Sequence, residues 1–432
     1  MSNRIRRRDF LKTTAAASAA LSFGVWSERG VAESKSPNEK LNIAAVGTGG
    51  MAVCDLDHLA GENIVALCDV DENTLNTAAS RFDRARKYVD FRQMFEKEEK
   101  NFDAVLVSTP DHIHAPASIM AMRMGKHCYC QKPLAHDIHE VRAMAKIAAE
   151  NKLATQMGIQ VHGTDNYRRV VEIIQAGVIG PVNEAVVWCQ KGWGGGKRPQ
   201  GTFAIPKYLH WNLWLGPAPE RPYAPKVYHP AEWRRWWDFG TGTLGDMACH
   251  LMDLPFWALG LRYVTSVETE GPAVDPETTP LGMTVRLNFP AVTGKPDVKL
   301  TWHDGNKTPN RVAGHPVPGM GVMFLGEKGQ MFADYNGYKL YPEDTFKDFQ
   351  APPQTIPASI GHWKEWIKAC KDGSPTTCNF DYAAALTEAV LLGNVAYRTG
   401  TRLQWDALAM KATNCPEADK FIRTQYREGW LL

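Results

Sequence analysis

Residues 41–52 read LNIAAVGTGGMA, the most informative stretch of the sequence for the fold. A short apolar run, Leu41 to Val46, ends in a cluster of glycines, and a helix-like segment follows. A run of this length that ends in glycine is typical of a buried strand that turns sharply into a helix. We therefore expect a strand, a tight glycine turn and a helix at this point of the chain.

Further short apolar runs alternate with helix-like segments after this stretch. They are Asn63 to Cys68, Asp103 to Ser108 and His127 to Cys130, and each is followed by polar residues or proline. Such runs, separated by helices, indicate βαβ units and a buried parallel sheet, in which ligands bind beyond the carboxyl ends of the strands. After a polar linker over residues 33–40, we predict a Rossmann domain over residues 41–154.

The pattern changes from about residue 155. Segments such as Met283 to Phe289 and Val298 to Trp302 alternate apolar with polar or small residues, as half-buried antiparallel strands do. A helical segment is expected from about Ile360 to Arg398. A chain of 432 residues is also longer than one hydrophobic core usually serves. We therefore predict an α/β Rossmann domain followed by an α+β domain over residues 155–432.

The first residues resemble an export signal. Residues 6–12 read RRRDFLK, a mildly apolar run follows, and Gly30 and Ala32 place small residues before a cleavage site after Ala32. This order is typical of a signal peptide rather than of a spanning helix, and its core resembles the twin-arginine signal. We expect residues 1–32 to be a twin-arginine signal peptide, the mature chain to have no membrane span, and the protein to be periplasmic or otherwise exported. The alternative is a basic amphipathic start that stays in the cytoplasm.

The composition of the chain restricts the classes of partner that it can bind. The net charge of +2 includes a leader with six basic and two acidic residues, so removing its +4 leaves −2 for the remainder. That balance gives no electrostatic basis for nucleic-acid binding. The nine cysteines lack the spacing of a disulfide framework and are expected to be small core residues. His112, His114, His136 and His139 lack a matching carboxylate or thiolate set, so no metal site is predicted.

The glycine turn has the spacing G-x-G-x-x-A of a dinucleotide fingerprint. Its residues are Gly47, Thr48, Gly49, Gly50, Met51 and Ala52. The first glycine permits the turn, the second lets the backbone approach a pyrophosphate, and the helix N-terminus attracts phosphates. Asp69 ends the next strand and can accept hydrogen bonds from a ribose diol, while no arginine follows it to bind a 2′-phosphate. These features predict that the cofactor is NAD rather than NADP. The alternative to a dinucleotide site is a glycine turn in an unrelated α/β protein.

Further motifs resemble those of the Gfo/Idh/MocA oxidoreductase family. They are DAVLVSTPDHIH (103–114), GKHCYCQKPL (125–134), GVIGPV (177–182), GTLGDMACHLMD (242–253) and AYRTG (396–400). The resemblance implies a Rossmann domain followed by a domain with a large, mainly antiparallel open sheet that covers the nicotinamide and binds the substrate. It also implies a homo-oligomer.

The resemblance assigns roles to individual residues. Besides the fingerprint and Asp69, the cofactor-binding residues would be Thr109, Pro110, His114, Gln131 and Lys132. Lys132 would lie near both nicotinamide and substrate, and Asp246 and His250 would form an acid–base pair. The family usually has Glu-Lys-Pro where this chain has Gln131-Lys132-Pro133, and losing that carboxylate removes an interaction that favours the charged ammonium.

The local chemistry of these residues points the same way. Asp246, His250 and Asp253 are spaced i, i+4 and i+7, which predicts that one helical face presents all three. Oxidation of a secondary alcohol requires its hydroxyl proton to leave, and histidine suits that role because its pKa lies near working pH. Lys132 can stabilise the developing alkoxide, and Asp246 can orient the imidazole or bind a neighbouring hydroxyl. Taken alone, an Asp-x-x-x-His pair is also typical of a helix surface or of a core histidine.

Residues 188–237 are dense in aromatic side chains, on which the C–H faces of sugars stack. Trp236 and Arg234 are predicted to contact the substrate, against the alternatives of a core tryptophan and a surface ion pair. The sequence as a whole predicts hydride transfer between tightly held NAD and a carbohydrate hydroxyl. A redox-neutral NAD-dependent glycosidase is the first alternative, since an NAD-dependent glycosidase branch of the broad family resembles this chain in leader and length. A non-catalytic sugar-binding protein is the second.

Overall fold

The computed structural model describes residues 39–292 and 294–432. The predicted signal peptide and most of the predicted linker therefore lie outside the described residues. Within the described part of the chain, no helix combines the length and the apolar character that crossing a bilayer requires.

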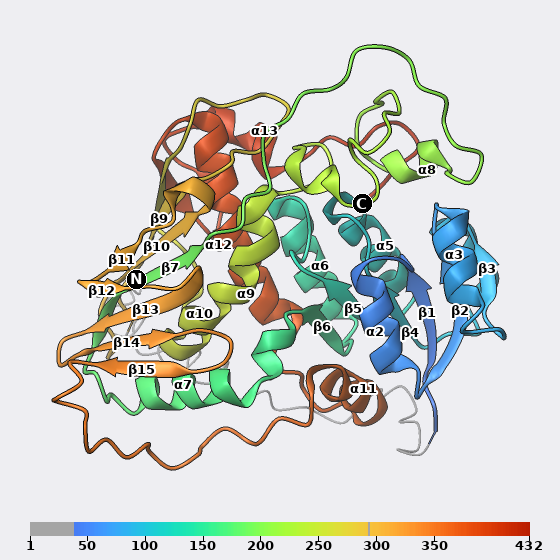
Figure 1. The fold of residues 1–432 in the computed structure, drawn as a ribbon. Coiled ribbons are helices and arrows are strands. Elements are labelled where there is room, and N and C mark those ends of the chain that lie inside the picture. Colours follow the sequence, from blue (N-terminus) through green and yellow to red (C-terminus); the bar gives the residue numbers. More distant parts are fainter. Residues whose placement is uncertain (1–38, 293) are drawn as a thin grey trace, which may run out of the picture. The chain divides into compact units, whose positions relative to one another are not determined.

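The chain from residue 42 to residue 158 forms a six-stranded parallel sheet with the strand order β3-β2-β1-β4-β5-β6 (Figure 1). The strands are β1 (Asn42–Val46), β2 (Asn63–Cys68), β3 (Arg86–Tyr88), β4 (Ala104–Val107), β5 (His127–Gln131) and β6 (Thr155–Gly158). The helices are α2 (Met51–Leu59), α3 (Glu72–Ala79), α4 (Phe91–Glu98), α5 (Asp111–Arg123) and α6 (Ile138–Glu150). This is the doubly wound Rossmann order, and it reverses between β1 and β4, where a ligand crevice forms at the carboxyl ends of the strands.

The last strand of this sheet lies beyond the boundary predicted after residue 154. Strand β6 reads TQMG, which is not an apolar run, but all four residues are buried and pair with β5 in parallel register. The sheet therefore extends to Gly158.

A second sheet of nine strands has the order β15-β14-β13-β7-β10-β9-β8-β16-β17. The strands are β7 (Val182–Cys189), β8 (Ser266–Glu270), β9 (Thr284–Phe289), β10 (Val298–Asp304), β13 (Met320–Gly326), β14 (Gln330–Ala333), β15 (Tyr338–Tyr341), β16 (Leu403–Asp406) and β17 (Lys411–Ala412). Strands β7 and β10 are parallel, and the other neighbours are antiparallel. The predicted fold, a Rossmann domain followed by a domain with a large, mainly antiparallel sheet, is confirmed.

Smaller elements complete this half of the chain. The α-helices are α7 (Asp165–Gln175), α8 (Trp211–Leu215), α9 (Cys249–Leu251), α10 (Asp253–Leu259), α11 (His362–Asp372), α12 (Phe380–Thr399) and α13 (Asp419–Ile422). Short 3-10 helices are η1 (Gln160–Gly163), η2 (Glu232–Arg235), η4 (Gly305–Lys307) and η5 (Pro416–Ala418), and η3 (Leu244–Ala248) is a π-helix. A separate pair of short strands is formed by β11 (Arg311–Val312) and β12 (His315–Pro316).

The predicted helical segment from Ile360 to Arg398 is two helices. Gly373 follows the last residue of α11 and takes a left-handed conformation (φ 73°). Asn379 precedes the first residue of α12, and its side chain accepts from the backbone N–H of Tyr382. Helix α11 returns to the first sheet, because Trp366 is buried in one cluster with Leu106 and Tyr129. The C-terminal part of the chain therefore packs on the Rossmann domain.

Candidate active site

A cavity of about 1170 Å³ lies at the carboxyl ends of the parallel strands and is lined from both halves of the chain. Twelve predicted site residues line it: Gly47, Gly49, Gly50, Met51, Asp69, Thr109, Pro110, Gln131, Lys132, Arg234, Asp246 and His250. Pockets for a single small ligand commonly measure about 300–1,000 Å³. This cavity therefore has room for a dinucleotide and a further small molecule.

The glycine turn fits a bound pyrophosphate. Gly47 has φ 86°, and a Cβ there would lie 2.3 Å from the carbonyl oxygen of Ser108, so only glycine allows β1 and β4 to approach this closely. Gly50 begins helix α2, and no side chain caps that N-terminus. The first N–H groups of the helix lack a side-chain acceptor beside the cavity, as an anion site requires.

Asp69 lies at the end of β2 and is held by the turn. Its Oδ2 accepts hydrogen bonds from the Thr48 N–H at 2.8 Å and the Thr48 hydroxyl at 3.0 Å, and its Oδ1 accepts from the N–H of Asp71. Thr48 itself is buried and does not line the cavity. Burial raises the pKa of Asp69 from its ordinary value. Asp69 and Asp71 both face the cavity. Two carboxylates there would repel the 2′-phosphate of NADP.

Lys132 and Asp246 form an ion pair between the two halves of the chain. The Lys132 Nζ donates to the Asp246 Oδ1 at 2.7 Å and to the Asp246 carbonyl at 2.8 Å, and the Arg234 Nε donates to the same Oδ1 at 3.0 Å. Burial opposes the charge on Asp246, but the neighbouring Lys132 and Arg234 charges outweigh it and hold its pKa below its ordinary value. Asp246 therefore stays ionised and supplies Lys132 with the carboxylate that position 131 lacks.

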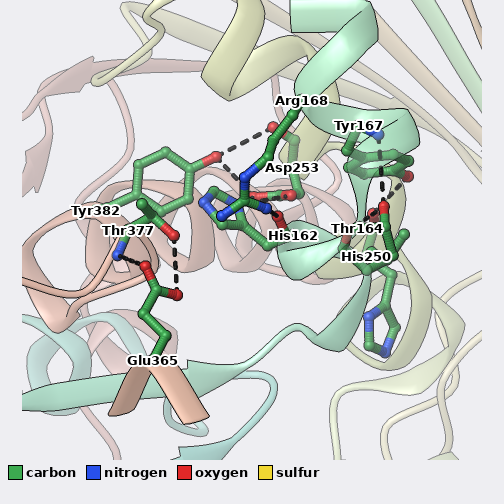
Figure 2. A network of polar contacts seen from close by, with 10 residues as sticks. His162, Thr164, Tyr167, Arg168, His250, Asp253, Glu365, Thr377 and Tyr382 are labelled. Atoms are coloured by element: carbon green, nitrogen blue, oxygen red, sulfur yellow. Dashed lines mark hydrogen bonds and ion pairs between the residues drawn. The ribbon is translucent and has the colours of Figure 1, made fainter. Parts of the chain in front are cut away.

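His250 lines the same cavity as this ion pair. Burial, followed by the positive charge of Lys132, lowers the pKa of His250 to about 3. The imidazole is therefore neutral near pH 7, but its pKa lies well below the value near working pH that was expected from the sequence. The hydroxyl of Tyr167 donates to the His250 carbonyl at 3.1 Å and fixes the backbone at this point (Figure 2).

The prediction that Asp246, His250 and Asp253 share one face is wrong for Asp253. A π-helix, whose turn is wider than that of an α-helix, spans Leu244 to Ala248 and precedes both His250 and Asp253. Asp253 is fully buried, 2.9 Å from the Nδ1 of His162, and accepts from the hydroxyl of Tyr382 at 2.7 Å (Figure 2). It holds η1 and α12 together and does not line the cavity.

Gln131 is bound to a buried carboxylate that sequence reasoning missed. Its Nε2 donates to the Oδ1 and Oδ2 of Asp55 at 3.1 and 2.9 Å. Asp55 also accepts from the Ser108 hydroxyl and from the Trp363 indole, each at 3.0 Å. Burial raises the pKa of this carboxyl. A signal was present in the sequence, because Asp55 lies on the same apolar face of α2 as Ala52, Leu56 and Leu59.

Two further predicted residues lie outside the cavity. His114 is fully buried, and its ring nitrogens contact the carbonyls of Pro133 at 2.7 Å and Thr109 at 2.9 Å, so it joins two loops that line the cavity. Trp236 is buried in a cluster with Tyr228, and its indole N–H donates to a backbone carbonyl. Other aromatic residues of the region line the cavity instead: Tyr208, Trp214, Tyr223 and Trp233.

In the described part of the chain, no three or more histidine, cysteine, aspartate or glutamate side chains form a group that could hold a metal ion. Seven of the nine cysteines are buried, and all nine are free thiols.

The fold and the cavity define a dinucleotide-binding enzyme of two domains, and comparison with known families agrees. Residues 41–159 match the family described as "Oxidoreductase family, NAD-binding Rossmann fold", and residues 167–432 match "Oxidoreductase family, C-terminal alpha/beta domain". The chain therefore belongs to the Gfo/Idh/MocA oxidoreductase family, as its motifs predicted, and the predicted NAD-binding Rossmann domain is confirmed.

Curated relatives match part of the chain. A glycosyl hydrolase family 109 protein of Shewanella baltica is 26% identical over 207 residues, which are 41% of this chain and 44% of that protein. Levoglucosan dehydrogenase of Pseudarthrobacter phenanthrenivorans is 24% identical over 184 residues, 42% of this chain and 39% of that protein. The chain thus spans less than half the length of these relatives.

Solved structures match over most of the chain. The WlbA dehydrogenase of Bordetella pertussis, solved with NADH and UDP-GlcNAcA, has a TM-score of 0.61 at 18% identity and covers 85% of this chain and 98% of that one. Aldose-aldose oxidoreductase of Caulobacter crescentus, solved with glycerol, has a TM-score of 0.59 at 17% identity and covers 85% and 100%. At such identities the likeness shows the fold alone.

Proposed function

We propose that this protein is an NAD-dependent oxidoreductase that acts on a hydroxyl group of a sugar, glycoside or polyol and holds its cofactor tightly. The proposal rests mainly on one observation. An ammonium (Lys132), a carboxylate (Asp246) and a neutral imidazole (His250) line one cavity together with the dinucleotide turn. Bound NAD supplies the hydride acceptor, and the remaining chemistry belongs to this chain's side chains.

Lys132 binds the oxygen that reacts. An ammonium has three N–H donors, and two of them are directed to Asp246, so one remains for a substrate hydroxyl. A fixed positive charge at that oxygen stabilises the negative charge that develops as the hydroxyl proton leaves. Asp246 holds the ammonium in place.

His250 is the proton acceptor. In its neutral form it can take the hydroxyl proton while Lys132 holds the oxygen, and it returns the proton when the reaction runs in reverse. The aromatic side chains that line the cavity, among them Trp233 and Tyr223, offer flat apolar surfaces that suit the C–H faces of a sugar ring. The guanidinium of Arg234 adds donors for a neighbouring hydroxyl.

Location belongs to the same proposal. The sequence RRRDFLK at residues 6–12 supports export by the twin-arginine route to the periplasm. Free NAD is scarce outside the cytoplasm, so an exported enzyme must keep its cofactor and regenerate it in the same site. We include a homo-oligomer in the proposal because the family resemblance supports one.

The test uses protein loaded with NAD and a panel of sugars, glycosides and polyols. We expect one class of compound to reduce the bound NAD, seen as absorbance at about 340 nm, with a keto product found by mass spectrometry. Lys132→Met should bind the nucleotide and form the keto product roughly 100- to 1,000-fold more slowly. Failure of every class to reduce the bound NAD, or to exchange deuterium with it, would contradict the proposal.

A redox-neutral glycosidase is the second candidate, supported by the similarity to the Shewanella baltica glycosyl hydrolase family 109 protein. In that reaction transient oxidation of a ring hydroxyl acidifies the neighbouring C–H bond, and elimination then expels the aglycone. Water adds, and the hydride returns to the sugar. An aryl glycoside in deuterated buffer separates the two candidates. Free phenol, ring deuterium and no net NADH indicate the glycosidase, whereas a stable keto glycoside indicates the oxidoreductase.

A further inference from the structure

A segment of the second half of the chain lies against the cofactor side of the cavity. We call residues 206–231 the strap. After β7 the chain leaves the second sheet as a long loop that leads to α8, which is part of the strap (Figure 1). Several strap residues line the cavity together with Asp69 and Asp71, among them Tyr208, Tyr223, Lys226 and His229.

The backbone of the strap pairs with the Rossmann domain directly after Asp69. The N–H of Glu72 donates to the carbonyl of Tyr208, and the N–H of His210 donates to the carbonyl of Val70, each at 2.9 Å. Leu209 and Asp71 therefore face each other in an antiparallel bridge.

Two histidine–carboxylate contacts strengthen this junction. The Nε2 of His210 lies 2.7 Å from the Oε1 of Glu72, and the Nε2 of His229 lies 2.8 Å from the Oδ2 of Asp71. The second pair is the better shielded, since its side chains are 22% and 10% exposed.

Apolar packing and a buried histidine anchor the rest of the strap. Val70 packs against a buried aromatic cluster that includes Leu209, Trp211 and Trp214. The Nε2 of His112, on helix α5, lies 3.0 Å from the carbonyl of Trp214. The strap is therefore attached to the Rossmann domain at residues 70–72 and again at helix α5.

We propose that the strap is a second cofactor-binding element, contributed by the C-terminal half of the chain, that retains NAD. The inference rests on the proposed binding of NAD at the glycine turn. A ribose bound at Asp69 lies beside residues 70–72, where the strap is attached. Lys226 offers a positive charge for phosphate, and Tyr208 and Tyr223 offer flat surfaces for an adenine ring. The nucleotide leaves only when the strap contacts to residues 70–72 break.

The test measures how fast NAD leaves, independently of turnover. Protein loaded with isotopically labelled NAD is chased with excess unlabelled NAD, and the label that remains bound is followed over time. The variant is His210→Ala/His229→Ala. The matched control is Lys371→Met, which removes a tie of 2.7 Å between α11 and Glu62 of the Rossmann domain, outside the cavity.

We expect NAD to dissociate roughly 5- to 30-fold faster from the double variant, since two partly exposed hydrogen-bonded pairs are lost. The control should match the wild type. If the double variant fails to fold, His210→Gln and His229→Gln, measured singly, should show smaller increases. Unchanged dissociation in the folded histidine variants overturns the strap proposal and leaves the proposed function standing. Wild-type exchange within seconds overturns the strap proposal together with the tight retention of NAD, and leaves hydride transfer to NAD standing. A wild-type protein that binds no NAD overturns both.

Discussion

Gln131→Glu should destabilise the protein strongly, and only above about pH 5. The Gln131 amide donates to both oxygens of Asp55, at 3.1 and 2.9 Å, inside the protein. A glutamate there places a second carboxylate against the first, and two buried carboxylates at this distance cannot both ionise. Holding one of them protonated at pH 7, about 2.7 units above the ordinary pKa of a glutamate, costs roughly 3.7 kcal/mol.

The pH dependence follows from the sign of the shift. The pKa of the shared carboxyl is higher in the folded than in the unfolded protein, so the folded protein binds more protons and loses stability as pH rises. The loss is about 1 kcal/mol at pH 5 and about 3–4 kcal/mol at pH 7. The reversed pair, Asp55→Asn/Gln131→Glu, again has one amide donor and one carboxylate. It should recover most of the stability that Gln131→Glu loses.

Urea unfolding of each variant at pH 5 and pH 7 measures these differences. Gln160→Glu is the matched control, because Gln160 also lines the cavity but donates to the Tyr129 hydroxyl rather than to a carboxylate. The Gln160→Glu substitution should lower the free energy of unfolding by about 1 kcal/mol or less at either pH. Equal stability of Gln131→Glu at both pH values, or a double variant no more stable than Gln131→Glu, would show that the two carboxyl groups do not share a proton.

The remaining predictions concern activity and cofactor choice. Lys132→Met should lower kcat by roughly 100- to 1,000-fold, because the developing alkoxide loses its fixed positive charge. Single-turnover rates on the substrate that the panel of compounds identifies would measure the decrease. The pKa of His250 is lowered to about 3, so the imidazole stays neutral and kcat/KM should be the same from pH 8 to pH 5 in a pH–rate profile. If the base had an ordinary histidine pKa, kcat/KM would fall about 30-fold over that range. Asp69→Ser should reduce the preference for NAD over NADP by at least about tenfold in equilibrium binding, since one of two carboxylates that oppose a 2′-phosphate is removed; an unchanged ratio would mean that Asp69 does not contact the ribose.

Much of the first domain could be predicted because its strands carry a strong local signal. The runs at β1, β2, β4 and β5 are apolar and end in glycine, polar residues or proline, as buried parallel strands do. Strand β3 reads RKY and is largely exposed at the sheet edge, and β6 reads TQMG, so neither carries that signal. Their strand structure comes from pairing with β2 and β5, which is a tertiary effect.

The site was predictable only as far as motifs and helical spacing reach. Lys132, Asp246 and His250 do meet in one cavity. Spacing alone does not reveal that Asp253 is fully buried against His162 and Tyr382. An aromatic-rich stretch also does not show which rings face a cavity and which, like Trp236, are buried in a cluster. The contacts between Asp55 and Gln131, and between the strap and residues 70–72, join segments that are far apart in the sequence.

The proposed function depends most on a retained nucleotide, which can be identified in the purified protein. Protein purified from its exporting host without added nucleotide is denatured, and the released small molecules are identified and quantified by mass spectrometry, with their redox state. We expect about one NAD or NADH per chain. A chain that releases no nucleotide and also fails to bind added NAD or NADP would contradict it.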